Sequence, residues 1–280
     1  MKAIILNLTA WSVLPIMDGI AKYLSSDIHF LHIVWGRYFF MVLISLPIAF
    51  LFFRKFLVWP KNIYLQFLRS VFLFLSTLLF FYAISIISMA KALALAFVSP
   101  IIVTILSAFL LKEKVGYHRW IAVIVGFLGA LIIIQPGFVT INLAAIAALG
   151  TGVSYAFYII STRKLTSLDN PILTLIFTGI FGALIISFLV PFYWNTLNLN
   201  QWLLMIILAA IGTFGHFCLI LSLNYAEASK LSPLAYFEIV NNILIGYYFF
   251  GDFPNKWLWL GLFFIISSGV YISFRENKTN

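Results

Sequence analysis

Glu238 lies near the middle of an apolar stretch of the chain, and the amides of Asn241 and Asn242 follow it within one helical turn. Residues three and four apart are neighbours on a helix surface, so the sequence predicts that these polar groups share one face. An ionisable side chain deep in lipid costs roughly 2.5–3.5 kcal/mol on insertion scales and needs a partner, an aqueous cavity or a function. We expect Glu238 to bind a cationic group of a ligand or to carry a proton. The alternatives are a structural ion pair with Arg37 or a protonated Glu238 bonded to an asparagine.

Three further ionisable groups lie in or near apolar stretches. Arg37 is a candidate for binding a carboxylate or phosphate through its planar guanidinium, or alternatively neutralises Asp18 or Glu238. Asp18 is a candidate ligand-binding residue, although its spacing of four from Lys22 is more typical of a local salt bridge. His216 is a candidate proton carrier because imidazole exchanges protons near neutral pH, and the alternative is a hydrogen bond between helices.

Aromatic side chains can enclose a cation or a planar ring in a cavity. The candidates for such a lining are Trp11, Tyr155, Tyr158 and Tyr236. Because the chain has thirteen tyrosines and eight tryptophans, anchoring at the membrane interface or simple packing is the alternative for any one of them.

Pro100 and Pro233 interrupt two apolar stretches, and each directly follows a serine. A proline removes a backbone hydrogen bond, which in a membrane helix exposes carbonyl groups and permits a hinge. We expect both prolines to act as hinges, and a kink without function is the alternative.

Membrane-spanning helices are the elements that must position these residues. Of the 280 residues, 64% are hydrophobic and only 9% are charged, which is too little polar surface for a water-soluble globule. A hydrocarbon core of roughly 30 Å takes about 20 apolar helical residues. Ten stretches of this size predict an all-α polytopic membrane protein, at 3–22, 30–53, 64–86, 90–111, 117–135, 142–161, 172–194, 202–222, 231–249 and 257–274.

The two halves of the chain repeat. A shift of 139 residues without gaps places Lys91 on Lys230, Glu113 on Asp252 and Trp120 on Trp259. Each half then contains five predicted spans, and an odd number of spans forces the second copy to be inverted in the bilayer. We expect a first repeat over 1–137, a second, inverted repeat over 138–280, and a binding cavity between them.

The positive charges indicate orientation in a membrane. The formal net charge is +9, but the basic residues are scattered at the ends of apolar stretches, so we expect no nucleic-acid partner. Of the seventeen Lys and Arg residues, thirteen, Arg69 among them, fall on the side of the N-terminus, and three fall on the other side, namely Lys22, Lys91 and Lys256. The positive-inside rule then predicts cytoplasmic termini, with the protein in a bacterial inner membrane.

Short motifs at characteristic places carry a resemblance to a known family. They are Trp35-Gly36-Arg37, Ser99-Pro100, Leu110-Leu111-Lys112-Glu113-Lys114, Gln135-Pro136-Gly137, Ser232-Pro233-Leu234-Ala235-Tyr236 and Phe250-Gly251-Asp252. In these motifs the chain resembles the EamA-type transporters of the drug/metabolite transporter superfamily. The resemblance implies ten helices in two inverted repeats, cytoplasmic termini and a central cavity formed by the inner helices. It is greatest to the branch that carries solutes such as S-adenosylmethionine and riboflavin, and it implies that Glu113 is a structural cap at the membrane surface.

These observations together predict a secondary transporter that works by alternating access. The mixture of acid, base, amides and aromatic groups suits a zwitterionic or partly cationic organic solute. No nucleotide-binding loop or hydrolase motif occurs in the sequence, and we expect no cofactor, no metal and no enzymatic activity. The expected partners are a small-molecule solute, the lipid bilayer and possible second copies in a homodimer. A membrane-embedded enzyme acting on lipid or isoprenoid substrates, or a passive channel, is the alternative.

Overall fold

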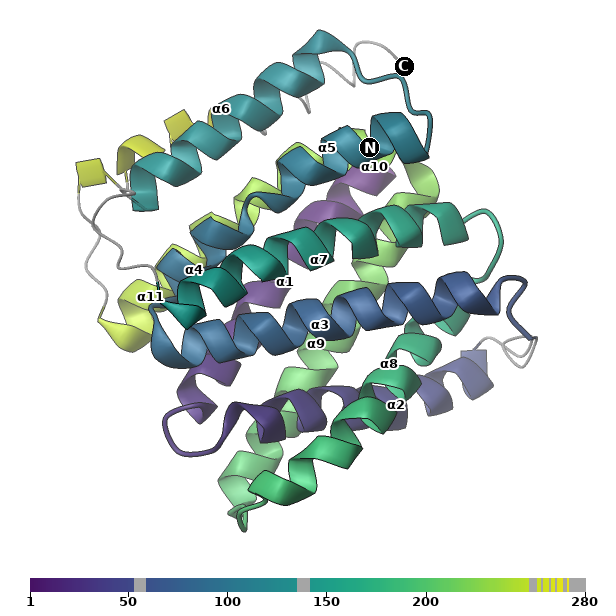
Figure 1. Ribbon diagram of the computed structural model, residues 1–280, viewed down its shortest axis with the longest axis vertical. Coiled ribbons are helices and arrows are strands. Elements are labelled where there is room, and N and C mark those ends of the chain that lie inside the picture. Colours follow the sequence, from purple (N-terminus) through teal and green to yellow (C-terminus); the bar gives the residue numbers. More distant parts are fainter. Residues whose placement is uncertain are drawn as a thin grey trace.

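The computed structural model describes residues 1–52, 59–134 and 142–251, together with 256–257, 259–261, 263–264, 266–268 and 271. Every regular element in these residues is a helix (Figure 1). In chain order they are α1 (Lys2–Leu24), α2 (Phe30–Phe52), α3 (Ile63–Ile86), α4 (Met89–Ala96), α5 (Ser99–Leu110), α6 (Tyr117–Ile134), α7 (Leu143–Leu165), α8 (Pro171–Leu189), η1 (Val190–Tyr193), α9 (Leu199–Tyr225), α10 (Ala228–Leu231), η2 (Ser232–Phe237) and α11 (Glu238–Phe250).

Asparagine side chains begin four of the long helices. Asn62, Asn142 and Asn170 each accept a hydrogen bond from a backbone N–H in the first turn of α3, α7 and α8. Asn198 and Gln201 form a reciprocal capping box at the start of α9. These bonds satisfy N–H groups that have no partner within the helix, and they fix where each helix leaves its polar connection.

Seven helical segments in the described part of the chain are long and apolar enough to cross a membrane. They are Lys2–Leu24, Phe30–Leu51, Ile63–Ile86, Met89–Leu110, Leu143–Leu165, Pro171–Tyr193 and Leu199–Tyr225. They coincide with seven of the predicted stretches, so the all-helical polytopic class is confirmed. Several helices are longer than predicted because polar residues at their ends continue the helix, as in α7 and α9.

The other three predicted stretches are not among these seven segments. The stretch at 117–135 corresponds to α6, and the stretch at 231–249 corresponds to the broken segment α10–η2–α11. Most of the stretch at 257–274 lies outside the described residues. A set of ten spans in two inverted repeats therefore remains a prediction.

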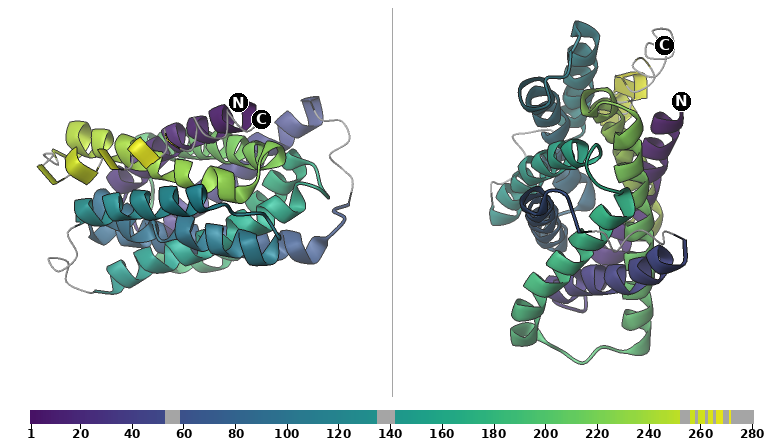
Figure 2. Two further views of the ribbon diagram at one scale, coloured as in Figure 1. Left: turned by 90° about the horizontal axis from the view of Figure 1, so that it is seen from above. Right: turned by 90° about the vertical axis from the view of Figure 1, so that its right-hand side faces the viewer.

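The helices of the two halves pack reciprocally. The most extensive contacts join α1 to α9 and α3 to α7, while α2 packs on α8 and α9, and α8 packs on α3. Figure 1 shows α3 and α7 side by side across the middle of the molecule. α6 and the connection between α8 and α9 lie at opposite ends of the longest dimension (Figures 1 and 2). If α1, α2 and α3 correspond to α7, α8 and α9, each contact between the halves has a counterpart.

Two helical segments are broken near Pro100 and Pro233, the prolines that were predicted to interrupt them. Pro100 lies in the first turn of α5 and cannot donate to the carbonyl of Ala96, where α4 ends. Pro233 lies in the first turn of η2 and cannot donate to Ser229, whose carbonyl instead accepts a bond of 3.3 Å from the Ser232 hydroxyl. The sequence thus locates both breaks, and a role for them as hinges remains a prediction.

The two broken helices also contact each other. α4 packs against α11, and α5 packs against α10 and η2. The hydroxyls of Thr104 in α5 and Ser232 in η2 are 2.9 Å apart and form a buried hydrogen bond. The breaks are therefore held next to each other in the interior of the molecule.

Candidate functional site

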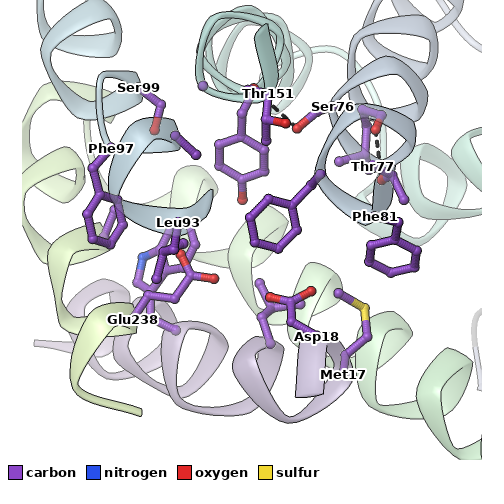
Figure 3. A pocket seen from close by; sticks show the side chains of 18 of the residues that line it. Met17, Asp18, Ser76, Thr77, Phe81, Leu93, Phe97, Ser99, Thr151 and Glu238 are labelled. Carbon is purple, nitrogen blue, oxygen red and sulfur yellow. Dashed lines mark hydrogen bonds between the residues drawn. The ribbon is translucent and has the colours of Figure 1, made fainter. Parts of the chain in front are cut away.

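A cavity of about 80 Å³ lies between these broken helices and the long helices α1, α2, α3, α7 and α9 (Figure 3). Its lining contains helical residues that lie well away from the helix ends, such as Arg37, Thr77 and Thr151. Residues from both halves of the chain line the cavity.

Four ionisable side chains line this cavity, each from a different helix. Asp18 comes from α1, Arg37 from α2, His216 from α9 and Glu238 from α11. All four are buried, with exposed fractions of 3%, 4%, 4% and 8% in that order. The structure thus brings together the four ionisable candidates identified in the sequence, although they are separated by up to 220 residues along the chain.

The Arg37 guanidinium is bonded to neutral groups. Its Nη1 donates to the hydroxyl of Thr77, and its Nη2 lies 2.7 Å from Nε2 of His216. The same guanidinium lies over the ring of Phe81, with 5.7 Å between its central carbon and the ring centroid. Among the described residues, no carboxylate lies within 4 Å of it. The predicted alternative, an ion pair of Arg37 with Asp18 or Glu238, is not formed.

The carboxylates of Asp18 and Glu238 have no partner in the described part of the protein. Neither accepts a hydrogen bond, and neither is in an ion pair. In Figure 3 both carboxylates project toward the same space. Burying a carboxylate without a partner is costly, so these two groups require a proton or a positive charge from a bound molecule.

Lys22 does not need Asp18 for its placement. Its ammonium donates to the carbonyls of Ile84 and Ile87 at the end of α3, at 3.3 Å for Ile87. These bonds tie the end of α1 to the end of α3. The predicted local pairing of Asp18 with Lys22 is therefore not what holds this lysine.

Aromatic rings form much of the remaining lining. Trp11 and Tyr155 lie with ring centroids 6.0 Å apart, and Phe80, Phe81 and Phe97 complete the apolar wall. Trp11 is fixed by a bond of 2.8 Å from its indole N–H to Asn7, and Asn7 donates in turn to Ser222. The hydroxyl of Tyr155 is buried without a hydrogen-bond partner in the described residues, so it is available to a ligand.

A second layer of polar groups lies behind His216. The Tyr158 hydroxyl is 3.3 Å from Nδ1 of His216 and accepts a bond of 3.2 Å from Arg69. Arg69 is fully buried, and its other donors reach Thr162 at 2.8 Å, the carbonyl of Thr174 at 3.1 Å and the Thr178 hydroxyl. The charge count placed Arg69 on the inner side, and the structure shows that this residue is buried within α3, almost two turns from the helix start at Ile63.

Four of the predicted site residues do not line the cavity. Tyr236 donates to the carbonyl of Val123 at 3.2 Å, and Asn242 donates to the Glu238 carbonyl at 3.3 Å. Asn241 donates to the Trp11 carbonyl at 3.4 Å and borders a separate groove between α1, α9 and α11. The fourth is Tyr158, in the second layer. Asn241 and Asn242 share a helix face with Glu238, but they lie about one turn, roughly 5 Å, further along α11, beyond the part of that face that lines the cavity.

Sequence reasoning missed Ser76 and Thr77, which lie in α3, and the lining residue Thr151. The signal was present as an adjacent pair of hydroxyl residues inside the apolar stretch of α3. Serine and threonine bond to their own helix backbone so readily that their presence alone does not identify a site. The Thr77 hydroxyl donates to the Leu73 carbonyl of its own helix at 2.9 Å and also accepts a bond from Arg37 in the site.

Glu113 follows the end of α5 and does not line the cavity. Its carboxylate accepts bonds of 3.0 Å from each of the backbone N–H groups of Ala228 and Ser229, and one of 2.7 Å from the Ser229 hydroxyl. Arg163 lies 3.6 Å from the same carboxylate. Glu113 thus caps the start of α10, in keeping with the structural role that the resemblance implied.

A polytopic helical protein with a small-molecule cavity between two parts of the chain has the general form of a membrane transporter. The model of the EamA-like transporter family matches residues 1–135 and again residues 142–274. The chain belongs to the EamA-like transporter family.

Relatives with stated functions are metabolite transporters. The S-adenosylmethionine uptake transporter of Rickettsia prowazekii is 25% identical over 279 residues, covering 98% of this chain and 95% of that protein. The protein of the same description from Rickettsia bellii is 27% identical, covering 93% of this chain and 89% of that protein. The riboflavin transporter of Vibrio cholerae is 31% identical over 196 residues, which are 67% of this chain and 63% of that protein.

The fold is also found in a solved crystal structure. That chain aligns with a TM-score of 0.82 at 14% identity, covering 99% of this chain and 98% of the other. The protein is therefore an integral membrane protein that transports a metabolite, and the family points to a transporter rather than an enzyme.

Proposed function

We propose that this protein is a secondary transporter for S-adenosylmethionine, or for a metabolite of the same cationic type, in a bacterial inner membrane. The observation that carries the proposal is the pair of buried carboxylates, Asp18 and Glu238, that face the cavity without a protein partner. A cargo with a positive charge would supply the missing partner. The uptake transporters of Rickettsia provide the chemical class.

S-adenosylmethionine matches the cavity group by group. Its sulfonium and ammonium groups are positive and would pair with Asp18 and Glu238. Its carboxylate is negative and would approach Arg37, whose guanidinium has five N–H donors, more than the two bonds to Thr77 and His216 use. Its adenine would stack on the aromatic wall around Tyr155, and a sulfonium is attracted to aromatic faces as other cations are.

Riboflavin is the competing cargo, because riboflavin transporters are also among the relatives. Its flavin ring would fit an aromatic wall. It has no positive charge, however, and would leave both Asp18 and Glu238 without a partner in an interior where such groups are costly. The charges in the cavity therefore favour the cationic cargo.

We further propose that the cargo is moved by alternating access between two inverted halves. The reciprocal packing of α1 with α9 and α3 with α7, and the two separate matches to the family model, support a duplicated architecture. The two broken helices that border the cavity support a site that opens by local rearrangement.

A polar cluster at the end of the molecule near α10 supports a closed state on that side. Glu113 and Arg119 come from the first part of the chain, and Arg163, Glu227 and Ser229 come from the second. Arg119 lies 2.8 Å from the Glu227 carboxylate and donates to Ser229 at 2.9 Å. These contacts, with those of Glu113, join the two parts and would have to break for the cavity to open there.

The test is transport by the purified full-length protein in proteoliposomes. Vesicles loaded with unlabelled S-adenosylmethionine should accumulate the radiolabelled compound by exchange, and Asp18→Asn and Glu238→Gln should each reduce the initial rate at least tenfold. S-adenosylhomocysteine, which lacks the methyl group and its positive charge, should compete at least tenfold more weakly. Equal competition by S-adenosylhomocysteine, or labelled riboflavin as the only exchanged compound, would overturn the proposal.

A further inference from the structure

His216 connects the carboxylate-containing cavity to the second polar layer behind it. A guanidinium has donors and no acceptor, so the 2.7 Å contact between Arg37 Nη2 and His216 Nε2 requires Nε2 to accept. Nε2 then carries no proton. The imidazole is neutral, and its single N–H is on Nδ1.

The group facing Nδ1 is compatible with this tautomer. The Tyr158 oxygen lies 3.3 Å from Nδ1 and has two lone pairs, of which one accepts from Arg69 and the other can accept from Nδ1–H. Arg69 holds Tyr158 in place because its own side chain is fixed by Thr162 and Thr178 on two helices. The orientation of the His216 ring is therefore set from behind, by α3 and α7.

Arg37 would be expected to lie against a carboxylate. Asp18 and Glu238 line the same buried cavity, and opposite charges attract strongly where the effective dielectric constant is low. Yet no carboxylate of the described residues lies within 4 Å of the guanidinium. The two groups that hold Arg37 elsewhere are Thr77 and His216, and each bonds one of its terminal nitrogens.

We propose that His216 is a positioning residue that determines cargo specificity, because its unprotonated Nε2 holds Arg37 away from Asp18 and Glu238 and so leaves both carboxylates for a cationic group of the cargo. The inference rests on the proposed function. Without this acceptor, Arg37 turns toward a carboxylate and competes with the cargo as an internal cation.

The same geometry requires His216 to stay neutral. Protonation of Nε2 would replace the acceptor by a donor and expel Arg37. The charged and titratable groups that face this ring or share its cavity come from five other helices: Asp18 from α1, Arg37 from α2, Arg69 from α3, Tyr155 and Tyr158 from α7, and Glu238 from α11. A proton on His216 would add a third positive charge beside Arg37 and Arg69.

Two substitutions separate the acceptor from the bulk of the side chain. In His216→Gln an amide oxygen can accept from Arg37 and the amide N–H can donate to Tyr158. In His216→Leu a side chain of similar volume offers neither group. Binding of S-adenosylmethionine to the detergent-purified full-length protein should stay within about threefold of wild type for His216→Gln and weaken at least tenfold for His216→Leu.

Removal of Arg37 supplies the decisive control. If His216 acts only by positioning Arg37, then Arg37→Met/His216→Leu should bind S-adenosylmethionine more tightly than His216→Leu alone, and adding His216→Leu to Arg37→Met should change affinity less than threefold. Equal weakening by His216→Leu in both backgrounds would overturn the proposal, as would wild-type affinity in His216→Leu. A merely structural role predicts no such dependence on Arg37.

One further measurement does not depend on the folding of the leucine variant. Nitrogen NMR of histidine-labelled protein should show His216 as the neutral tautomer with the proton on Nδ1, assigned by the resonance that His216→Gln removes among the four histidines. A proton on Nε2 would overturn the proposal.

The NMR result keeps the two proposals apart. If wild-type protein binds no S-adenosylmethionine but His216 has its proton on Nδ1 and loses this preference in Arg37→Met, the proposed cargo is wrong and the positioning of Arg37 stands. If wild type binds S-adenosylmethionine and His216→Leu has no effect, the cargo stands and the positioning role is wrong.

Discussion

Replacing Glu238 by glutamine separates binding from stability more cleanly than any other substitution in the cavity. Glutamine has nearly the shape of glutamate and lacks its charge. The carboxylate of Glu238 accepts no hydrogen bond from the described residues, so no protein group loses its partner when the charge is removed. The bonds of Arg37 to Thr77 and His216 are also unaffected.

The expected loss of affinity follows from the charge. A hydrogen bond to a charged group contributes about 1.5–3 kcal/mol net, and a factor of ten in affinity corresponds to about 1.4 kcal/mol. Glu238→Gln should therefore weaken S-adenosylmethionine binding by about 10- to 150-fold. The melting temperature without ligand should stay the same or rise, because the variant no longer buries an unpartnered carboxylate.

Isothermal titration calorimetry and thermal unfolding of the same detergent-purified samples measure both quantities. Asp27→Asn also replaces a carboxylate by an amide, in the exposed connection between α1 and α2 outside the cavity, and should leave affinity within twofold of wild type. A clear drop in the melting temperature of Glu238→Gln would show that the carboxylate has a structural partner. An affinity within threefold of wild type would show that the cargo does not use it. Either result would refute the reasoning.

Three other substitutions test the surroundings of the site. Arg69→Met should lower the free energy of unfolding by about 2–4 kcal/mol, because it leaves several buried acceptors without their donor. Arg69→Lys should not restore this stability, because one ammonium group cannot reach all of these acceptors. Denaturant unfolding measures both variants. Gly182→Ala should cost about 1–3 kcal/mol, because a Cβ there would lie 2.3 Å from the Tyr38 ring, whereas Gly116→Ala, with no atom within 4 Å, should be neutral in the same measurement. Glu113→Ala should speed hydrogen exchange of the α10 backbone at least tenfold, because the N–H groups of Ala228 and Ser229 lose a charged acceptor. Mass spectrometry measures this exchange, and an unchanged rate would show that Glu113 does not stabilise α10.

Local chemistry accounts for what could be predicted of the fold. The apolar stretches gave the helices to within a few residues at most ends, because a membrane leaves a backbone little alternative to helical hydrogen bonding. Pro100 and Pro233 located the two breaks, because a proline has no N–H to donate to the carbonyl four residues earlier, whatever surrounds it.

The site was predicted in part. Asp18, Arg37, His216 and Glu238 could be singled out because each ionisable group in an apolar stretch requires an explanation. Their bonding could not be predicted. One expectation for Arg37 was that it neutralises a carboxylate, and the structure pairs it with Thr77 and His216 instead.

The sequence by itself determined that this protein lies in a membrane, where its helices run and break, and that a few ionisable groups lie within apolar stretches. Only the tertiary structure decided which of them meet, since it turned Tyr236 and Asn241 away from the cavity and buried Arg69 against two other helices. The physical reason is that the spans are apolar on nearly every side. The hydrophobic pattern therefore does not specify the rotation of a helix about its axis, which is fixed by packing between residues far apart in the chain.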